Sequence, residues 1–127
     1  MSGTILYIED NHQSIRLVRK ILKNADYRML AEKNAMVGIL VARIHKPDLI
    51  LMDINLPWID GVQALDRLRA EKVLQNIPVI AITAHTDYGD RERFLKAGFD
   101  DYIPKPISGR DLVAAVNAII DAKADKG

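Results

Sequence analysis

Acidic residues follow two strongly apolar segments of the sequence. The run "DLILMD" (48–53) ends in Asp53, and the run "TILYIE" (4–9) ends in Glu9, which Asp10 follows. A charge at the end of a buried strand is costly unless a partner compensates it. Three carboxylates that meet also repel one another and raise one another's pKa. The sequence therefore predicts a cation site where these segments end.

The candidate ligands indicate which cation and which chemistry. The chain has no Cys, and its three His residues do not show metal-binding spacing. A set of oxygen ligands favours a hard ion, Mg²⁺ before Ca²⁺. Because Mg²⁺ neutralises charge on an incoming phosphate, a bound Asp is able to attack a phosphoryl group. Asp53 is thus a candidate nucleophile that receives a phosphoryl group.

Two further strand-like segments are followed by groups that suit a phosphoryl ligand. "PVIAIT" (78–83) ends in Thr83, which Ala84 follows, and "DYI" (101–103) precedes Lys105. The Thr83 hydroxyl and the Ala84 backbone N–H would donate hydrogen bonds, and Lys105 would add positive charge. Each residue alone has a common structural explanation. Their joint occurrence at four of five predicted strand ends favours a functional site.

The elements that position these residues alternate between two patterns. Strands are expected at 4–9, 27–31, 48–53, 78–83 and 101–103, and several are apolar throughout, as in parallel sheets. Helical spacing is expected at 11–25, 34–46, 60–71, 87–97 and after a predicted N-cap at Ser108. The alternation predicts an α/β fold with a doubly wound, five-stranded parallel sheet. Such sheets bind ligands beyond the carboxyl ends of their strands.

The overall composition excludes several classes of protein. The net charge of +1 argues against a dedicated nucleic-acid or membrane binder. No apolar run approaches the roughly 20 residues that span a bilayer, and "MSGTILYIED" is not a signal peptide. We therefore expect a soluble, cytoplasmic protein. The chain is expected to be one domain (1–127), with a core at about 4–122 and a short tail at 123–127.

Four segments together resemble the receiver domain of two-component response regulators. They are "YIEDN", "PDLILMDINLPWIDG", "IPVIAITA" and "KAGFDDYIPKPIS", and the resemblance runs from about residue 4 to 122. It implies a flavodoxin-like (βα)₅ fold and a single-domain, chemotaxis-type or cell-cycle-type receiver. The implied partners are a histidine kinase or histidine phosphotransfer protein and an unknown downstream protein. The implied assembly is a monomer or weak homodimer.

The resemblance also implies roles at the metal site. Asp53 matches the phospho-accepting aspartate, and Glu9 and Asp10 match the acidic pair that holds Mg²⁺. Asn55 matches the position whose backbone carbonyl joins the metal. By the same resemblance, the chain is not an enzyme beyond Mg²⁺-dependent self-phosphorylation and self-dephosphorylation.

Further roles follow on the phosphate side of the site. Thr83, Ala84 and Lys105 match the phosphate-binding residues, and Tyr102 matches the aromatic residue that follows the Thr in the switch. The family often has a cis bond where Lys105 precedes Pro106, and the cis form before Pro costs only about 0.5–1 kcal/mol.

Some positions depart from the family pattern or have an open role. Asp26 stands where Gly is common before the second strand, and we expect it to adopt the left-handed conformation. Trp58 is either a partner-docking residue or an ordinary loop aromatic. His85 either tunes hydrolysis of the phosphoryl group or has no role.

Alternative functions remain open at the level of sequence. The chain could be a receiver fragment of a larger regulator or hybrid kinase, or a scaffold of the same fold that acts without phosphorylation. An aspartate-nucleophile phosphatase is disfavoured, because that class needs a second Asp where this chain has Asn55.

Overall fold

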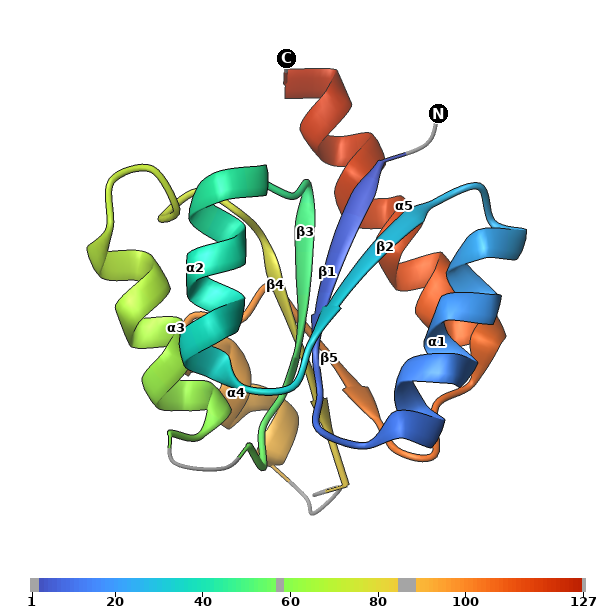
Figure 1. Cartoon of the computed structure of the whole chain (residues 1–127), viewed down its shortest axis with the longest axis horizontal. Helices are drawn as coiled ribbons and strands as arrows, with labels where there is room; N and C mark the ends of the chain where they lie inside the picture. Colours follow the sequence, from blue (N-terminus) through green and yellow to red (C-terminus); the bar gives the residue numbers. More distant parts are fainter. Residues whose placement is uncertain (1–2, 57–58, 85–88, 127) are drawn as a thin grey trace.

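The computed structural model describes residues 3–56, 59–84 and 89–126, which form one sheet covered by helices (Figure 1). The strands are β1 (Thr4–Ile8), β2 (Arg28–Glu32), β3 (Leu49–Asp53), β4 (Val79–Thr83) and β5 (Asp101–Pro104). The helices are α1 (His12–Asn24), α2 (Ala35–His45), α3 (Gly61–Ala70), α4 (Asp90–Ala97) and α5 (Gly109–Lys126).

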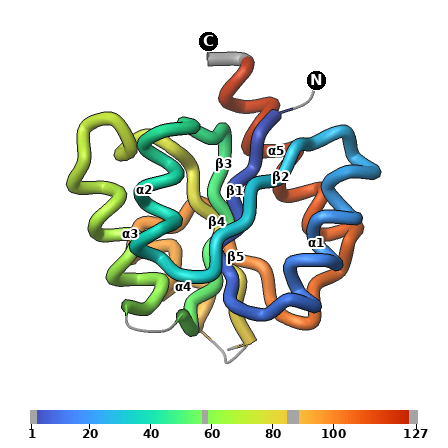
Figure 2. Tube along the Cα trace, in the orientation of Figure 1, coloured from blue at the N-terminus to red at the C-terminus, as the bar shows by residue number. Residues whose placement is uncertain are grey.

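The sheet is parallel throughout, with the strand order β2-β1-β3-β4-β5. Helices α1 and α5 cover one face, and α2, α3 and α4 cover the other (Figure 1). The order reverses between β1 and β3, which are neighbours although β2 separates them in the sequence. Figure 2 shows that β1 begins and α5 ends at the same edge, opposite the carboxyl ends of the strands. The predicted doubly wound α/β fold is confirmed.

Each central strand supplies residues to two separate cores. Because side chains alternate along a strand, Leu6 and Ile8 pack beneath α2 and α3, whereas Ile5 and Tyr7 pack beneath α1 and α5. β3 and β4 are buried along their whole length. This two-sided burial explains why their sequences are apolar almost throughout.

Polar side chains cap the N-terminal ends of most of the helices. The Asn11 side chain accepts a hydrogen bond from the Ser14 N–H at 2.9 Å, and Asp60 and Gln63 form a reciprocal capping box at α3. The predicted cap at Ser108 is confirmed, since its hydroxyl oxygen accepts from the Asp111 N–H at 3.3 Å.

Asp26 has the expected left-handed conformation, with φ of 65°. Two helix boundaries differ from those expected from the sequence. The helix expected from residue 87 begins at Asp90, after Gly89 with φ of 91°, and residues 87 and 88 lie outside the described residues. α5 continues through Lys126, beyond the core boundary expected at residue 122.

Candidate metal and phosphoryl site

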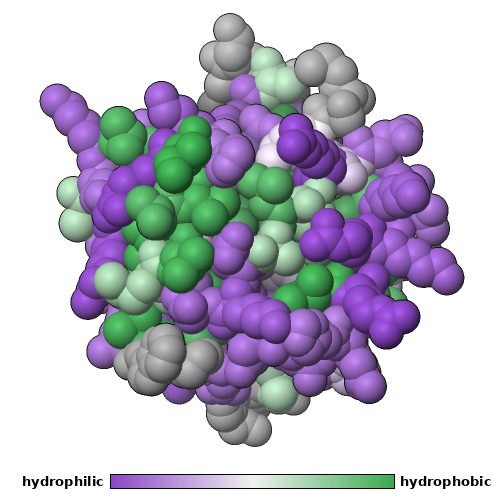
Figure 3. Space-filling model, in the orientation of Figure 1, coloured by the Kyte–Doolittle hydropathy of each residue, from purple (hydrophilic) through white to green (hydrophobic). Residues whose placement is uncertain are grey.

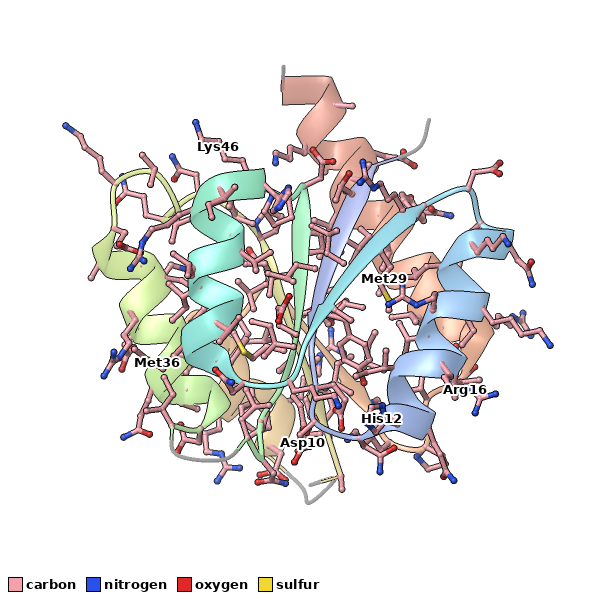
Figure 4. The ribbon with its side chains drawn as sticks, in the orientation of Figure 1. Asp10, His12, Arg16, Met29, Met36 and Lys46 are labelled. Carbon is pink, nitrogen blue, oxygen red and sulfur yellow. The ribbon has the colours of Figure 1, made fainter. Side chains whose placement is uncertain are left out.

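The topology brings three predicted carboxylates to one edge of the sheet. Glu9, Asp10 and Asp53 each offer an oxygen, and these oxygens all lie within 4.8 Å of one another. Glu9 and Asp53 are only 1% and 4% exposed, whereas Asp10 is exposed. Figure 4 shows Asp10 at the edge where the carboxyl ends of the strands lie. All three side chains are close enough to share one cation.

Lys105 supplies positive charge to this cluster. Its Nζ atom lies 3.2 Å from Oε2 of Glu9 and 3.6 Å from Oδ2 of Asp53. The backbone N–H of Lys105 donates to the carbonyl of Thr83 at 2.8 Å, which ties the loop after β5 to the end of β4. The Lys105–Pro106 bond is cis, as predicted. The buried carboxylate of Asp53 therefore has a cationic partner from a distant part of the chain.

Glu9 has an unusual electrostatic environment. Burial, the Asp53 charge and a hydrogen bond with Asp53 raise the pKa of Glu9 to about 7 from its ordinary value of 4.5, against a lowering effect of Lys105. The Asn11 N–H donates to Oε1 of Glu9 at 3.2 Å. A bound cation would favour the ionised form of Glu9, so a metal ion fits this set of oxygen ligands.

Tyr7 is a neighbour of Glu9 that the sequence-based site did not include. Its hydroxyl donates to Oε2 of Glu9 at 3.3 Å. Burial raises the pKa of Tyr7, and the Glu9 and Asp53 charges raise it further, so the hydroxyl stays protonated. The signal was present in the sequence, because the period of two along a strand places Tyr7 on the same side as Glu9.

Two backbone N–H groups donate hydrogen bonds that hold the segment just after Asp53. The Asn55 N–H donates to Oδ1 of Asp53 at 3.2 Å, and the Gly61 N–H donates to the Ile54 carbonyl at 2.9 Å. A Cβ atom at Gly61 would lie 2.9 Å from the carbonyl oxygen of Asp53. Gly61 therefore allows the start of α3 to approach the strand end that carries Asp53. The predicted role of the Asn55 carbonyl stays a prediction.

The remaining predicted residues lie at neighbouring strand ends. Thr83 is fully buried at the end of β4, beside β3, and Ala84 follows it at the surface. Tyr102 lies in β5, and its ring stacks on Phe94 of α4 with centroids 5.6 Å apart. The phosphate and switch roles of these residues stay predictions. Trp58 and His85 lie outside the described residues.

The chain matches the family model of the response regulator receiver domain over residues 5–117. It belongs to this family. It is 39% identical over 108 residues to the polar-differentiation response regulator DivK of Brucella anthropi, covering 85% of this chain and 88% of the relative. The DivK protein of Brucella ovis is 38% identical over the same length. The predicted family and the predicted response regulator function are confirmed.

Solved receiver domains have the same fold. The receiver domain of the sensor histidine kinase PA1611 from Pseudomonas aeruginosa, which has a magnesium ion in its active site cleft, is 32% identical with a TM-score of 0.86. The alignment covers 95% of this chain and 99% of that one. The receiver domain of a histidine kinase from Syntrophus aciditrophicus is 30% identical with a TM-score of 0.85, covering 94% and 91%.

Membership of this family defines the class of activity. Receiver domains are signalling domains that work with histidine kinases and downstream targets, rather than enzymes in the ordinary sense. Among the described residues, no helix is long and apolar enough to cross a membrane.

Proposed function

We propose that this receiver takes a phosphoryl group onto Asp53 from the phosphohistidine of a histidine kinase or histidine phosphotransfer protein. The observation that carries the proposal is the position of Asp53, which lies within 4.8 Å of two other carboxylates and 3.6 Å from the Lys105 ammonium group. Negative and positive groups thus surround one buried carboxylate at a strand end. That arrangement suits binding of both a cation and an anionic phosphoryl group.

Mg²⁺ is the proposed cofactor. The carboxylates of Glu9, Asp10 and Asp53 and the backbone carbonyl of Asn55 would hold it. When bound, Mg²⁺ supplies positive charge that neutralises the phosphoryl oxygens. The magnesium ion in the Pseudomonas aeruginosa receiver domain supports this assignment.

The transfer itself needs few groups from the protein. A carboxylate oxygen of Asp53 forms a bond to phosphorus, the phosphorus–nitrogen bond of the donor breaks, and its electron pair stays on the imidazole nitrogen. The product is an acyl phosphate at Asp53. Lys105, which contacts both Asp53 and Glu9, would then pair with a phosphoryl oxygen. The Thr83 hydroxyl and the Ala84 N–H would donate to the other oxygens.

The new bonds would switch a protein-binding surface. Tyr102 stacks on Phe94, so a rearrangement that begins at Thr83 has a packed route through β5 to α4. Moving a two-state equilibrium from 1:99 to 99:1 requires about 5.5 kcal/mol of differential stabilisation. Hydrogen bonds to charged groups contribute about 1.5–3 kcal/mol each, so a few of them supply energy of this order. The switched surface would pass the signal on by contact with a partner protein. The receiver would also dephosphorylate itself when Mg²⁺ is present.

Mass measurement after chemical phosphorylation tests the proposal. The protein is incubated with Mg²⁺ and acetyl phosphate, then weighed intact. The wild type should gain one phosphoryl group, and Asp53→Asn should gain none. Asp66→Asn is the matched control, because Asp66 is an exposed carboxylate on α3, and this variant should label like the wild type. Equal labelling of Asp53→Asn and the wild type would refute the assignment.

A further inference from the structure

Helix α2 carries large apolar side chains on the side that faces solvent. Met36, Leu40 and Ile44 recur every four residues and are 49%, 49% and 67% exposed, and Val37 beside them is 40% exposed. Figure 3 shows hydrophobic side chains gathered on the part of the surface that α2 and α3 occupy in Figure 1. The other side of α2 packs into the core. The core therefore explains only one of the two apolar sides of this helix.

A hollow of about 260 Å³ lies beside this apolar line, between α2 and α3. It is lined by Met36, Ile39, Arg43, Arg67, Ala70 and Glu71. A cavity of about 150 Å³ accommodates benzene, so this hollow has room for one large apolar side chain. A hollow next to an exposed apolar line is the geometry by which a groove receives an amphipathic helix.

The charged side chains that line the hollow, Arg43, Arg67 and Glu71, carry a net charge of +1. Glu71 pairs with Arg43 at 2.7 Å, so the excess positive charge comes from Arg67. The Nη1 atom of Arg67 contacts the sulfur of Met36 at 3.3 Å. α2 contains no acidic residue, and Lys46 lies at its C-terminal end (Figure 4). The complementary ligand is therefore apolar along one side and acidic along its flanks.

We propose that the α2–α3 face, formed by Met36, Val37, Leu40, Ile44 and the adjacent hollow, binds an amphipathic helix of a partner protein with Asp or Glu on its flanks. The line from Met36 to Ile44 covers eight residue steps, or about 12 Å of helix, which matches two to three turns of a bound helix. A second copy of this chain fits less well, because a two-fold interface would bring the same positive linings together. A flat lipid surface would leave the hollow unfilled.

The phosphoryl site lies elsewhere, so this binding does not require Asp53 to be phosphorylated. The exposed line of α2 is formed by side chains that point away from the sheet, whereas Glu9, Asp10 and Asp53 lie at the carboxyl ends of β1 and β3. Failure of phosphorylation and failure of helix binding are therefore separate outcomes. Asp53→Asn should bind the helix as the wild type does.

Selection from a displayed library of helical peptides tests the proposal. The library has an apolar side that varies among Leu, Ile, Phe and Ser and flanks that vary among Glu, Lys and Ser. The expected survivors have apolar residues at three-to-four spacing and Glu on their flanks. A survivor made as a free fluorescent peptide should bind Leu40→Asn/Ile44→Asn at least about tenfold more weakly than the wild type. Arg67→Glu should weaken it as well.

Leu17→Asn is the matched control, because Leu17 is an equally exposed Leu (46%) on α1, on the other side of the sheet. It should bind the peptide within about twofold of the wild type, since its surface lies outside the proposed face. No enriched sequences, survivors with basic flanks, or equal binding to the α2 double variant would overturn the proposal. The proposal would also be overturned if the wild type bound anionic lipid vesicles more tightly than the selected peptide. A dimer that sedimentation detects in the wild type and that Leu40→Asn abolishes would overturn it as well.

Discussion

The ammonium group of Lys105 lies 3.2 Å from the carboxylate of Glu9, a residue 96 positions earlier in the sequence. The same ammonium group lies 3.6 Å from Asp53, so one lysine contacts two of the three clustered acids. Lys105 thus compensates part of the negative charge that a metal ion would also compensate. Lys105 and Mg²⁺ are therefore expected to compete for the same carboxylates. After phosphorylation, the ammonium group of Lys105 can pair with the phosphoryl group instead.

Replacing Lys105 should separate metal binding from switching. Lys105→Ala removes a cation beside the ligands, so Mg²⁺ affinity at pH 8 should rise by about threefold to tenfold. The phosphorylated variant should lose its phosphorylation-dependent partner binding, because the phosphoryl group has lost its cationic contact. Calorimetry measures the first effect, and a comparison of partner binding before and after phosphorylation measures the second. A collapse of Mg²⁺ affinity with normal switching would require a different role for Lys105.

The raised pKa of Glu9 predicts a pH dependence of stability in metal-free protein. Between pH 4.5 and about 7, Glu9 is protonated when folded and ionised when unfolded, so the unfolded state binds fewer protons. Its contribution to the free energy of unfolding is therefore fully present below pH 4.5 and falls as the pH rises through about 7. Glu9→Gln should lose this fall, which is on the order of a few kcal/mol at about 1.4 kcal/mol per unit of pKa shift.

Urea denaturation in EDTA at a series of pH values measures this difference. At each pH the free energy of unfolding of Glu9→Gln is subtracted from that of the wild type, which cancels the contribution of groups that do not contact Glu9. Adding Mg²⁺ should reduce the difference, because the ion favours ionised Glu9. Identical pH profiles for the two proteins in EDTA would show that Glu9 titrates normally.

Gly61 should be intolerant of a side chain. A Cβ atom there would lie 2.9 Å from the Asp53 carbonyl oxygen and 2.9 Å from the Ile54 Cα. Backbone atoms cannot rotate away, so Gly61→Ala should lower the free energy of unfolding by about 1–3 kcal/mol and slow the phosphorylation of Asp53. Chemical denaturation and the rate of labelling by acetyl phosphate measure the two effects.

Gly109→Ala provides the control for that experiment. A Cβ atom at Gly109 would be 3.4 Å from its nearest neighbour, a side-chain atom of Ile21. This variant should change stability by less than about 1 kcal/mol and leave the labelling rate unaltered. Equal effects of the two substitutions would show that close approach at Gly61 does not hold the strand end.

The strands, helices and acidic cluster could be predicted because their signals are local. Runs that are apolar almost throughout mark β3 and β4, and the alternation of strands and helices predicts that Glu9 and Asp53 lie at the same edge of the sheet. The strand order, which makes β1 and β3 neighbours, comes from the structure. The contact between Lys105 and Glu9 could not be predicted in this way, because no local sequence pattern specifies that the Lys105 side chain contacts the residue that follows β1. The expected start of α4 at residue 87 was wrong, because Gly89 has a left-handed conformation and the helix begins only after it, at Asp90.

The sequence also does not predict that one apolar side of α2 is exposed. The segment from Ala35 to His45 is apolar on both sides, so its pattern does not reveal which side faces the sheet. Only the packing shows that Ile39 is buried while Leu40 is exposed.

Chemical trapping of the phosphorylated residue tests the central claim most directly. An acyl phosphate at an aspartate is reduced by borohydride to homoserine, which labels the residue that carried the phosphoryl group. After incubation with Mg²⁺ and acetyl phosphate, reduction and peptide sequencing by mass spectrometry should find homoserine at position 53, with Glu9 and Asp10 unmodified. Modification of Glu9 or Asp10 with position 53 intact would contradict the account.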